Sequence, residues 1–186
     1  GSLVAAKQAV RAGVKAFVHM SSSAVFGSPN QCPITHNTPL KPVEIYGRAK
    51  LEGELVVREI CEKQNLPLIV IRPRTILGAG RLGIFQILFE WINDNSNIYT
   101  IGDGNGLFQF IHANDLMDFY ILALNNQKPG IYNVGAKDFG TLNKALENLI
   151  IHAKSESRIK HLHPELTIGM LKVLDRLGLS PLAPWH

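Results

Sequence analysis

The sequence predicts an α/β fold built around a largely parallel sheet. Two short apolar runs, "KAFVHMSS" and "LPLIVIRP", are typical of buried parallel strands, and they flank a long helical pattern at residues 44–64. A third run, "PGIYNVG", follows the helical stretch "NDLMDFYILALNN". Strands that alternate with helices of about 10–20 residues form βα units, whose strands lie parallel in one sheet.

The remaining elements follow from periodicity and from turn residues. Residues 2–12, "IFQILFEWIND" and "TLNKALENLIIHA" have helical patterns, and Thr141 is expected to cap the last of these. Asn114 or Asp115 is expected to cap the "NDLMDFYILALNN" helix. Prolines and asparagines predict a loop over residues 27–42, and "NIYTIGDGNGLFQFIH" predicts two short strands around a glycine-rich turn. From Ser155 onward the chain is predicted to be helical and loop-like.

The composition is that of an ordinary globular protein with a modest positive charge. Apolar residues make up 46% of the 186 residues, charged residues make up 18%, and the formal net charge is +4. The basic residues are scattered rather than gathered in a tract, which argues against a nucleic-acid partner. No apolar run reaches the ~18 residues that a bilayer span needs, and the first ten residues lack a signal-peptide pattern. We therefore expect no membrane association and a cytoplasmic location.

Tyr46 and Lys50 form the most suggestive chemical pair in the sequence. They stand at i and i+4 near the start of the predicted 44–64 helix, so both side chains leave the same helix face. A phenol that works as a base near neutral pH needs its pKa lowered from about 10 by ~3 units, which costs ~4 kcal/mol. A cation ~4 Å away at an effective dielectric constant of ~20 supplies roughly that energy. Taken alone, the pair could equally be an aromatic side chain and a solvated lysine that share a helix face.

Serines directly follow the first predicted strand. In "FVHMSSSAVFG", Ser21, Ser22 and Ser23 come at the carboxyl end of the strand, where open α/β sheets place their ligand sites. A serine there can bond both a tyrosine hydroxyl and a substrate oxygen; the alternative is a polar turn that closes the strand. The glycine clusters "LGAGRLG" and "GDGNG" are interpreted as turns rather than as phosphate-binding loops, since a lone glycine cluster is weak evidence.

The sequence predicts no metal site. Cys32 and Cys61 have neither metal-ligand spacing nor a disulfide framework, so reduced thiols are expected. His152, His161 and His163 lie in a polar region without a convergent acidic ligand, which favours a structural or solvated role. His112, in "FIHAND", is expected to bond locally near a helix start.

In order and spacing, these motifs resemble the second half of an extended short-chain dehydrogenase/reductase of the NAD-dependent epimerase/dehydratase family. The segments that carry the resemblance are "AGVKAFVHMSSSAVFG", "YGRAK", "LIVIRP", "IGDGNGLFQFIHANDL" and "GIYNVG". The resemblance implies the C-terminal part of a Rossmann-type parallel sheet at residues 1–76 and 110–135, with a small, mostly helical substrate lobe at 77–109 and 136–186. It also implies an epimerase or oxidoreductase that uses NAD or NADP and acts on a nucleotide sugar or a related hydroxyl or keto substrate.

The resemblance assigns roles to the matching residues. Tyr46 would be the general acid/base, Lys50 would hold the nicotinamide ribose and lower the pKa of the tyrosine, and Ser22 would orient the substrate oxygen. Ser23 is the alternative to Ser22. Further cofactor contacts are expected from Ser21, Arg72 and Pro73, and further substrate contacts from Ser23, Ala24, Arg74, Thr75, Arg81 and Phe108.

The sequence departs from the family pattern in three places. The glycine-rich nucleotide-binding half is absent from this chain, so we expect the chain alone to bind the cofactor poorly and to be incomplete for activity. Phe108 and Gln109 stand where nucleotide-sugar members often carry an arginine for the pyrophosphate, and Arg74 and Arg81 are candidates to replace it. Ser23 and Ala24 stand where dehydratases carry an acidic pair, which disfavours a 4,6-dehydratase.

Two alternative functions stay open, and a homodimer is also expected. The protein could be a hydroxysteroid-type dehydrogenase or reductase, or a truncated, non-catalytic relative that serves as a binding module. The resemblance also implies a homodimer of the full-length protein, because family members commonly pair through the helices that match residues 2–12 and 44–64.

Overall fold

The computed structural model describes residues 1–29, 32–80, 85–167 and 169, and the chain divides into two compact units. The first unit comprises Gly1–Arg81 and Gln109–Lys137. The second comprises Leu82–Phe108 and Asp138–His186. Within the described residues no helix is both long and apolar enough to cross a membrane.

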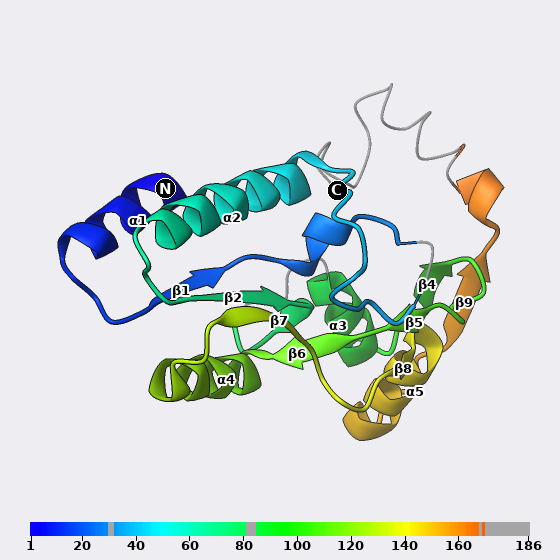
Figure 1. The fold of residues 1–186 in the computed structure, drawn as a ribbon. Coiled ribbons are helices and arrows are strands. Elements are labelled where there is room, and N and C mark those ends of the chain that lie inside the picture. Colours follow the sequence, from blue (N-terminus) through cyan, green and yellow to red (C-terminus); the bar gives the residue numbers. More distant parts are fainter. Residues whose placement is uncertain (30–31, 81–84, 168, 170–186) are drawn as a thin grey trace. The chain divides into compact units, whose positions relative to one another are not determined.

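A parallel three-stranded sheet organises the first unit (Figure 1). Its strands are β1 (Phe17–Met20), β2 (Leu68–Pro73) and β7 (Gly130–Val134), in the order β1-β2-β7. Helices α1 (Ser2–Arg11) and α2 (Ile45–Lys63) lie side by side on one face, and α4 (Ala113–Asn126) covers the other. A second, two-stranded parallel sheet joins β3 (Thr75–Leu77) to β6 (Phe110–His112).

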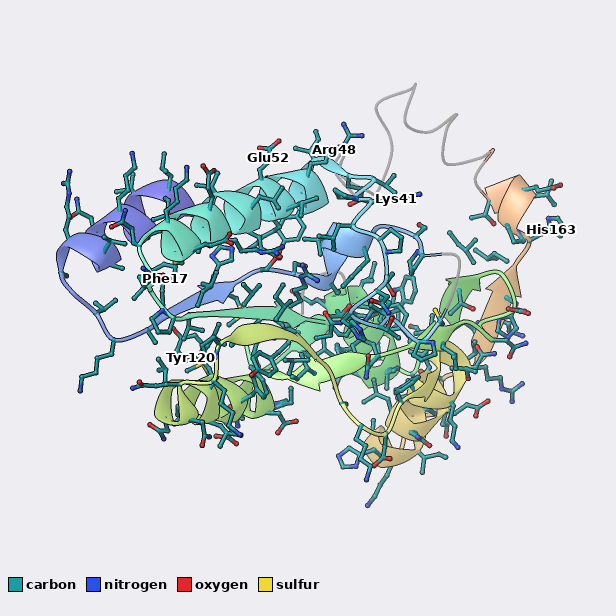
Figure 2. The ribbon with its side chains drawn as sticks, viewed as in Figure 1. Phe17, Lys41, Arg48, Glu52, Tyr120 and His163 are labelled. Carbon is teal, nitrogen blue, oxygen red and sulfur yellow. The ribbon has the colours of Figure 1, made fainter. Side chains whose placement is uncertain are left out.

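The two faces of the sheet are filled by alternate residues of its strands, as the period of a strand requires. Ile69 and Ile71 of β2 pack with Leu116 of α4 on one side. On the other side Leu68 packs against Ala6, Val57 and Cys61 of the helix pair. In Figure 2, Phe17 lies on the side of α2 and Tyr120 lies on the side of α4. Both faces of the central strand are therefore covered, which explains why its sequence is apolar almost throughout.

The carboxyl end of β1 continues into a short 3₁₀ helix, η1 (Ser23–Phe26). Val25 and Phe26 are buried in this turn, and the Ser22 side chain caps its start. Gly27 ends it with a positive φ of 63°, and a Cβ at that position would overlap the carbonyl group of Lys41. Only glycine fits this close passage of the chain.

In the described residues of the second unit, helices α3 (Gln86–Asn93) and α5 (Leu142–Ala153) accompany short strand pairs. Strand β4 (Ile98–Ile101) pairs in parallel with β9 (Ile159–Leu162), and β5 (Leu107–Phe108) pairs antiparallel with β8 (Gly140–Thr141). Ile92, Ile98 and Leu146 form the buried centre of this unit.

The predicted α/β class with parallel strands is confirmed, and so is the Thr141 cap, whose Oγ1 accepts from the Lys144 backbone N–H at 3.2 Å. The predicted cap of α4 is wrong. His112, rather than Asn114 or Asp115, occupies the cap position, and its Nδ1 accepts from the Asn114 N–H at 3.2 Å. The region after Ser155 was expected to be helical and loop-like, yet it contains β9. This strand is defined by its pairing with β4 rather than by a local apolar pattern.

Candidate functional site

Tyr46 and Lys50 lie one turn apart at the start of α2, and Lys50 is anchored to the sheet. The Lys50 Nζ donates a hydrogen bond to the carbonyl oxygen of Met20, the last residue of β1, at 3.2 Å. The same Nζ lies 5.8 Å from the centre of the Tyr46 ring. Tyr46 itself is 58% exposed. The structure thus places an ammonium group beside an accessible phenol at the carboxyl end of a parallel strand.

The serine turn packs directly against the first turn of α2. Ser22 Oγ accepts a hydrogen bond from the Ala24 backbone N–H at 3.2 Å, which holds the turn in place. A Cβ on Gly47 would lie 2.6 Å from the carbonyl oxygen of Ala24, so the two backbones approach as closely as glycine allows. The structure therefore brings the Ser22 turn and the Tyr46 turn into contact. In the described part of the chain no hydrogen bond links the Ser22 and Tyr46 hydroxyls.

A buried carboxylate, Glu54, lies one further turn along α2. Its side chain is fully buried, and Oε2 accepts from Ser21 Oγ at 2.8 Å and from Arg72 Nε at 3.0 Å. Oε1 accepts from Arg72 Nη2 at 2.5 Å. Burial opposes ionisation of this carboxyl, but hydrogen bonds from Arg72 and Ser21 and the charges of Arg72 and Arg58 outweigh it, so the pKa of Glu54 lies below its ordinary value. Glu54 is an ion-paired anion beneath the serine turn.

Sequence reasoning missed Glu54, although its spacing could have revealed it. Residues 46, 50 and 54 follow each other at i, i+4 and i+8 on one helix face. An acidic residue on the face that meets the sheet needs a buried partner. The arginine of "LIVIRP" was that partner.

The expected cofactor residues Ser21, Arg72 and Pro73 lie at the ends of β1 and β2, where their side chains are buried. The Ser21 hydroxyl and the Arg72 guanidinium both contact Glu54, and the guanidinium also lies over the Phe26 ring at 5.1 Å. Pro73 is paired in register with Val134. A contact between Arg72 and a cofactor would therefore have to come from its backbone.

The expected substrate residues are distributed over both units. Arg74 Nη1 donates to Ser23 Oγ at 3.3 Å, so these two side chains meet across the ends of β2 and β1. Within the described residues Arg74 has no ion-pair partner. Ala24 and Thr75 lie in η1 and β3 of the same unit.

The other two expected substrate residues do not belong to the described part of the first unit. Phe108 belongs to β5 of the second unit, where its ring meets the Phe85 ring edge-on, with 5.6 Å between the ring centres. Arg81 lies outside the described residues.

His19 is a further titratable group on β1 near this site. The residue is 9% exposed, and its Nε2 is buried without a hydrogen-bond partner among the described residues. Burial lowers the pKa of His19 below its ordinary value; the negative charge of Glu54 counters this and the positive charge of Lys50 adds to it. Burial therefore disfavours the charged form of His19.

Three of the remaining histidines take part in hydrogen bonds through a side chain or a carbonyl oxygen. His161 Nδ1 bonds to Thr100 Oγ1 at 2.9 Å, and His112 caps α4 as described above, which confirms the expected local bond. His163, labelled in Figure 2, precedes the last described helical turn, where its carbonyl oxygen accepts from Thr167. In the described ranges no group of three or more His, Cys, Asp or Glu side chains is placed to hold a metal ion.

Comparison with known proteins shows which sequences the chain is similar to. The sequence model described as "NAD dependent epimerase/dehydratase family" matches residues 1–135. The protein y4nG of Sinorhizobium fredii is 42% identical over 186 residues, which is the whole of this chain and 47% of the relative. UDP-arabinose 4-epimerase 1 of Arabidopsis thaliana is 29% identical over 148 residues, covering 66% of this chain and 35% of the relative. The chain thus spans about half, or less, of the length of these curated relatives.

Solved structures share the fold. UDP-N-acetylglucosamine 4-epimerase of Methanobrevibacter ruminantium, in complex with UDP-N-acetylmuramic acid, matches with a TM-score of 0.79 at 21% identity, over 87% of this chain and 54% of its own. UDP-glucuronic acid 4-epimerase of Bacillus cereus, in complex with NAD, matches with a TM-score of 0.78 at 20% identity, over 88% of this chain and 55% of its own. At these identities the likeness concerns the fold alone.

Proposed function

The chain belongs to the NAD-dependent epimerase/dehydratase family, and from that premise we propose that the full-length protein is an NAD(P)-dependent epimerase or oxidoreductase acting on a nucleotide sugar. Ser22, Tyr46 and Lys50 would form its catalytic set. The observation that carries the proposal is the anchoring of Lys50 to Met20 O at 3.2 Å, because it fixes the ammonium group and the neighbouring phenol at the carboxyl end of β1. Open α/β sheets bind their ligands at this end.

Each member of the set has a definite task in the proposed reaction. The Tyr46 oxygen takes the proton from the substrate hydroxyl while the carbon that carries this hydroxyl is oxidised to a carbonyl. It returns the proton when the carbonyl is reduced again. Ser22 donates its O–H to the same substrate oxygen and so holds it at the phenol. Lys50 places its positive charge beside Tyr46, with Nζ 5.8 Å from the centre of the ring. A bound nicotinamide would supply the hydride acceptor and donor.

The residues present fit the nicotinamide ribose of such a cofactor. An ammonium group has three N–H donors, and Lys50 uses one of them on Met20 O. Within the described segments no carboxylate pairs with Lys50, so its remaining donors are available to vicinal hydroxyl groups. NAD is bound in the B. cereus neighbour, which supports this cofactor for the proposed reaction.

The substrate class rests on the relatives and on the charge of the site. UDP-arabinose 4-epimerase 1 and the two solved structures named above are UDP-sugar epimerases. Arg74 adds a cation beside Ser23, suited to an anionic substrate group. An epimerase returns the hydride to the opposite face of the ketone and leaves the cofactor unchanged overall. A dehydrogenase would release the ketone and accumulate reduced cofactor.

The test is turnover of UDP-sugars by the full-length protein, followed both by epimer formation and by net reduction of NAD. Tyr46→Phe should lower kcat by roughly 10²–10⁴-fold. The matched control is Tyr99→Phe, the same change at a tyrosine of β4 that is 47% exposed. Unchanged turnover in Tyr46→Phe would contradict the proposed catalytic set, and epimerisation without net reduction of NAD would favour the epimerase over the dehydrogenase.

We also propose that the full-length protein forms a homodimer through α1 and α2. These helices lie side by side on one face of the sheet (Figure 1) and expose the apolar residues Leu3, Val4 and Leu55. Arg48 and Glu52 project from α2 away from the strands (Figure 2). Sedimentation velocity should give a dimer that Val4→Asp with Leu55→Asp weakens; a wild-type monomer would contradict the proposal.

A further inference from the structure

We infer that Glu54 is a positioning residue of the proposed site: its buried carboxylate fixes the register of α2 against the ends of β1 and β2, and so holds Tyr46 and Lys50 at the Ser22 turn. This inference rests on the proposed function for its kinetic consequences. Its structural part, the clamping of one helix to two strands, stands on contacts within the first unit.

The carboxylate lies on the same face of α2 as the proposed catalytic pair. Tyr46, Lys50 and Glu54 are spaced by one helical turn each. Two residues of this face contact adjacent residues at the end of β1: Lys50 contacts the carbonyl of Met20, and Glu54 contacts the side chain of Ser21. A shift of the helix along its axis would break both contacts together.

Glu54 joins three elements through one group. Its oxygens accept from Ser21 at the end of β1 and twice from Arg72 at the end of β2. A carboxylate that is fully buried is stable as an anion only when such partners satisfy it. Because the two Arg72 bonds form a planar fork, they fix the direction of the carboxylate as well as its distance.

The close passage of Gly47 and Ala24 makes this register important. A Cβ at residue 47 would lie 2.6 Å from the Ala24 oxygen, so α2 cannot move toward η1. Glu54 prevents the opposite movement, away from the strand ends. The reacting groups of a site must be held within a fraction of an ångström, and a displacement of about 1 Å lowers rates by roughly a hundredfold. Glu54 touches no reacting atom, and acts through the placement of α2.

The cleanest test is Ser21→Ala in the full-length protein, because it removes one arm of the clamp and leaves the buried Glu54–Arg72 pair intact. We expect kcat per folded protein to fall roughly ten- to a hundredfold, while KM for the UDP-sugar changes little. Hydrogen exchange measured by mass spectrometry should quicken in the peptide covering residues 42–54 and stay unchanged in α4. Ser21→Thr, which keeps the hydroxyl, should restore both readouts.

Two further variants separate positioning from general stability. Glu54→Gln keeps the size of the side chain and removes its charge, and should give the same local exchange pattern together with a lower melting temperature, because Arg72 loses its anion. Glu59→Gln is the matched control: it breaks an exposed ion pair with Lys63 on the same helix. It should leave kcat and the exchange of residues 42–54 unchanged.

The outcomes distinguish this inference from the proposed function. If the wild-type protein turns over UDP-sugars but Ser21→Ala alters neither kcat nor the exchange of residues 42–54, Glu54 does not position α2. Faster exchange spread evenly over α2 and α4 would also overturn the inference, since it would show a role in stability alone. If the wild-type protein does not turn over UDP-sugars but Ser21→Ala quickens hydrogen exchange selectively in residues 42–54, the positioning role of Glu54 is supported and the proposed function is contradicted.

Discussion

Gly47 of α2 and Ala24 of η1 approach so closely that no side chain fits between them. A Cβ on Gly47 would lie 2.6 Å from the Ala24 carbonyl oxygen and 3.0 Å from the Cβ of Pro42. The first of these contacts involves backbone, which cannot move without displacing the serine turn. The glycine that follows Tyr46 is therefore what allows the tyrosine turn and the serine turn to touch.

Gly47→Ala should separate these turns and lower both stability and turnover. Overpacking of a tight backbone contact costs about 1–3 kcal/mol, although alanine favours a helix over glycine by about 1 kcal/mol. The control is Gly53→Ala in the same helix, where the added Cβ would meet the side-chain oxygen of Ser2 at 3.0 Å, a group that can rotate away. Denaturant unfolding of the two full-length variants should show a loss for Gly47→Ala and no loss for Gly53→Ala.

Glu54 should make the protein sensitive to acid. Its pKa in the folded state lies below the ordinary value of 4.5, so the unfolded chain binds more protons than the folded one as the pH falls through this range. The stabilisation is present above pH 4.5 and is lost as the pH falls through the folded pKa. Glu54→Gln should remove this part of the pH dependence and cost roughly 3–5 kcal/mol at pH 7, because Arg72 is left buried and unpaired. Unfolding measured between about pH 3 and 7 in both proteins would test the sign.

His19 should cause a second loss of folding stability on acidification, at a higher pH than the loss caused by Glu54. Burial keeps its folded pKa below the ordinary value of 6.5, so protons bind preferentially to the unfolded chain as the pH falls below that value. The stabilisation is present above pH 6.5 and is lost as the pH falls through the folded pKa. His19→Met, of similar size and without a titrating group, should flatten the stability curve of the full-length protein below pH 6.5. An unchanged slope would show that another group titrates there.

Features set by local pattern were predictable from the sequence, and features set by distant contacts were not. The alternation of strands and helices and the Thr141 cap depend on residues close together in the chain. The role of Glu54 depends on Ser21 and Arg72, which lie 33 and 18 positions away and meet it only once the sheet has formed. Strand β9 likewise needs its partner β4, more than fifty residues earlier.

Ser22 and Ser23 have different partners, which predicts which of them acts on the substrate oxygen. Ser22 Oγ accepts from the Ala24 backbone N–H within its own turn, whereas Ser23 Oγ accepts from the Arg74 guanidinium. Each hydroxyl keeps its O–H as a donor, so the difference is that a distant charged side chain engages Ser23. Ser22→Ala should therefore lower kcat by roughly 10²–10³-fold and cost about 1 kcal/mol of stability through loss of the cap. Ser22→Thr keeps the hydroxyl and should retain most of the activity. Ser23→Ala should mainly raise KM, because Arg74 loses its hydrogen-bond partner. A larger loss of kcat in Ser23→Ala than in Ser22→Ala would show that Ser23, rather than Ser22, acts on the substrate oxygen.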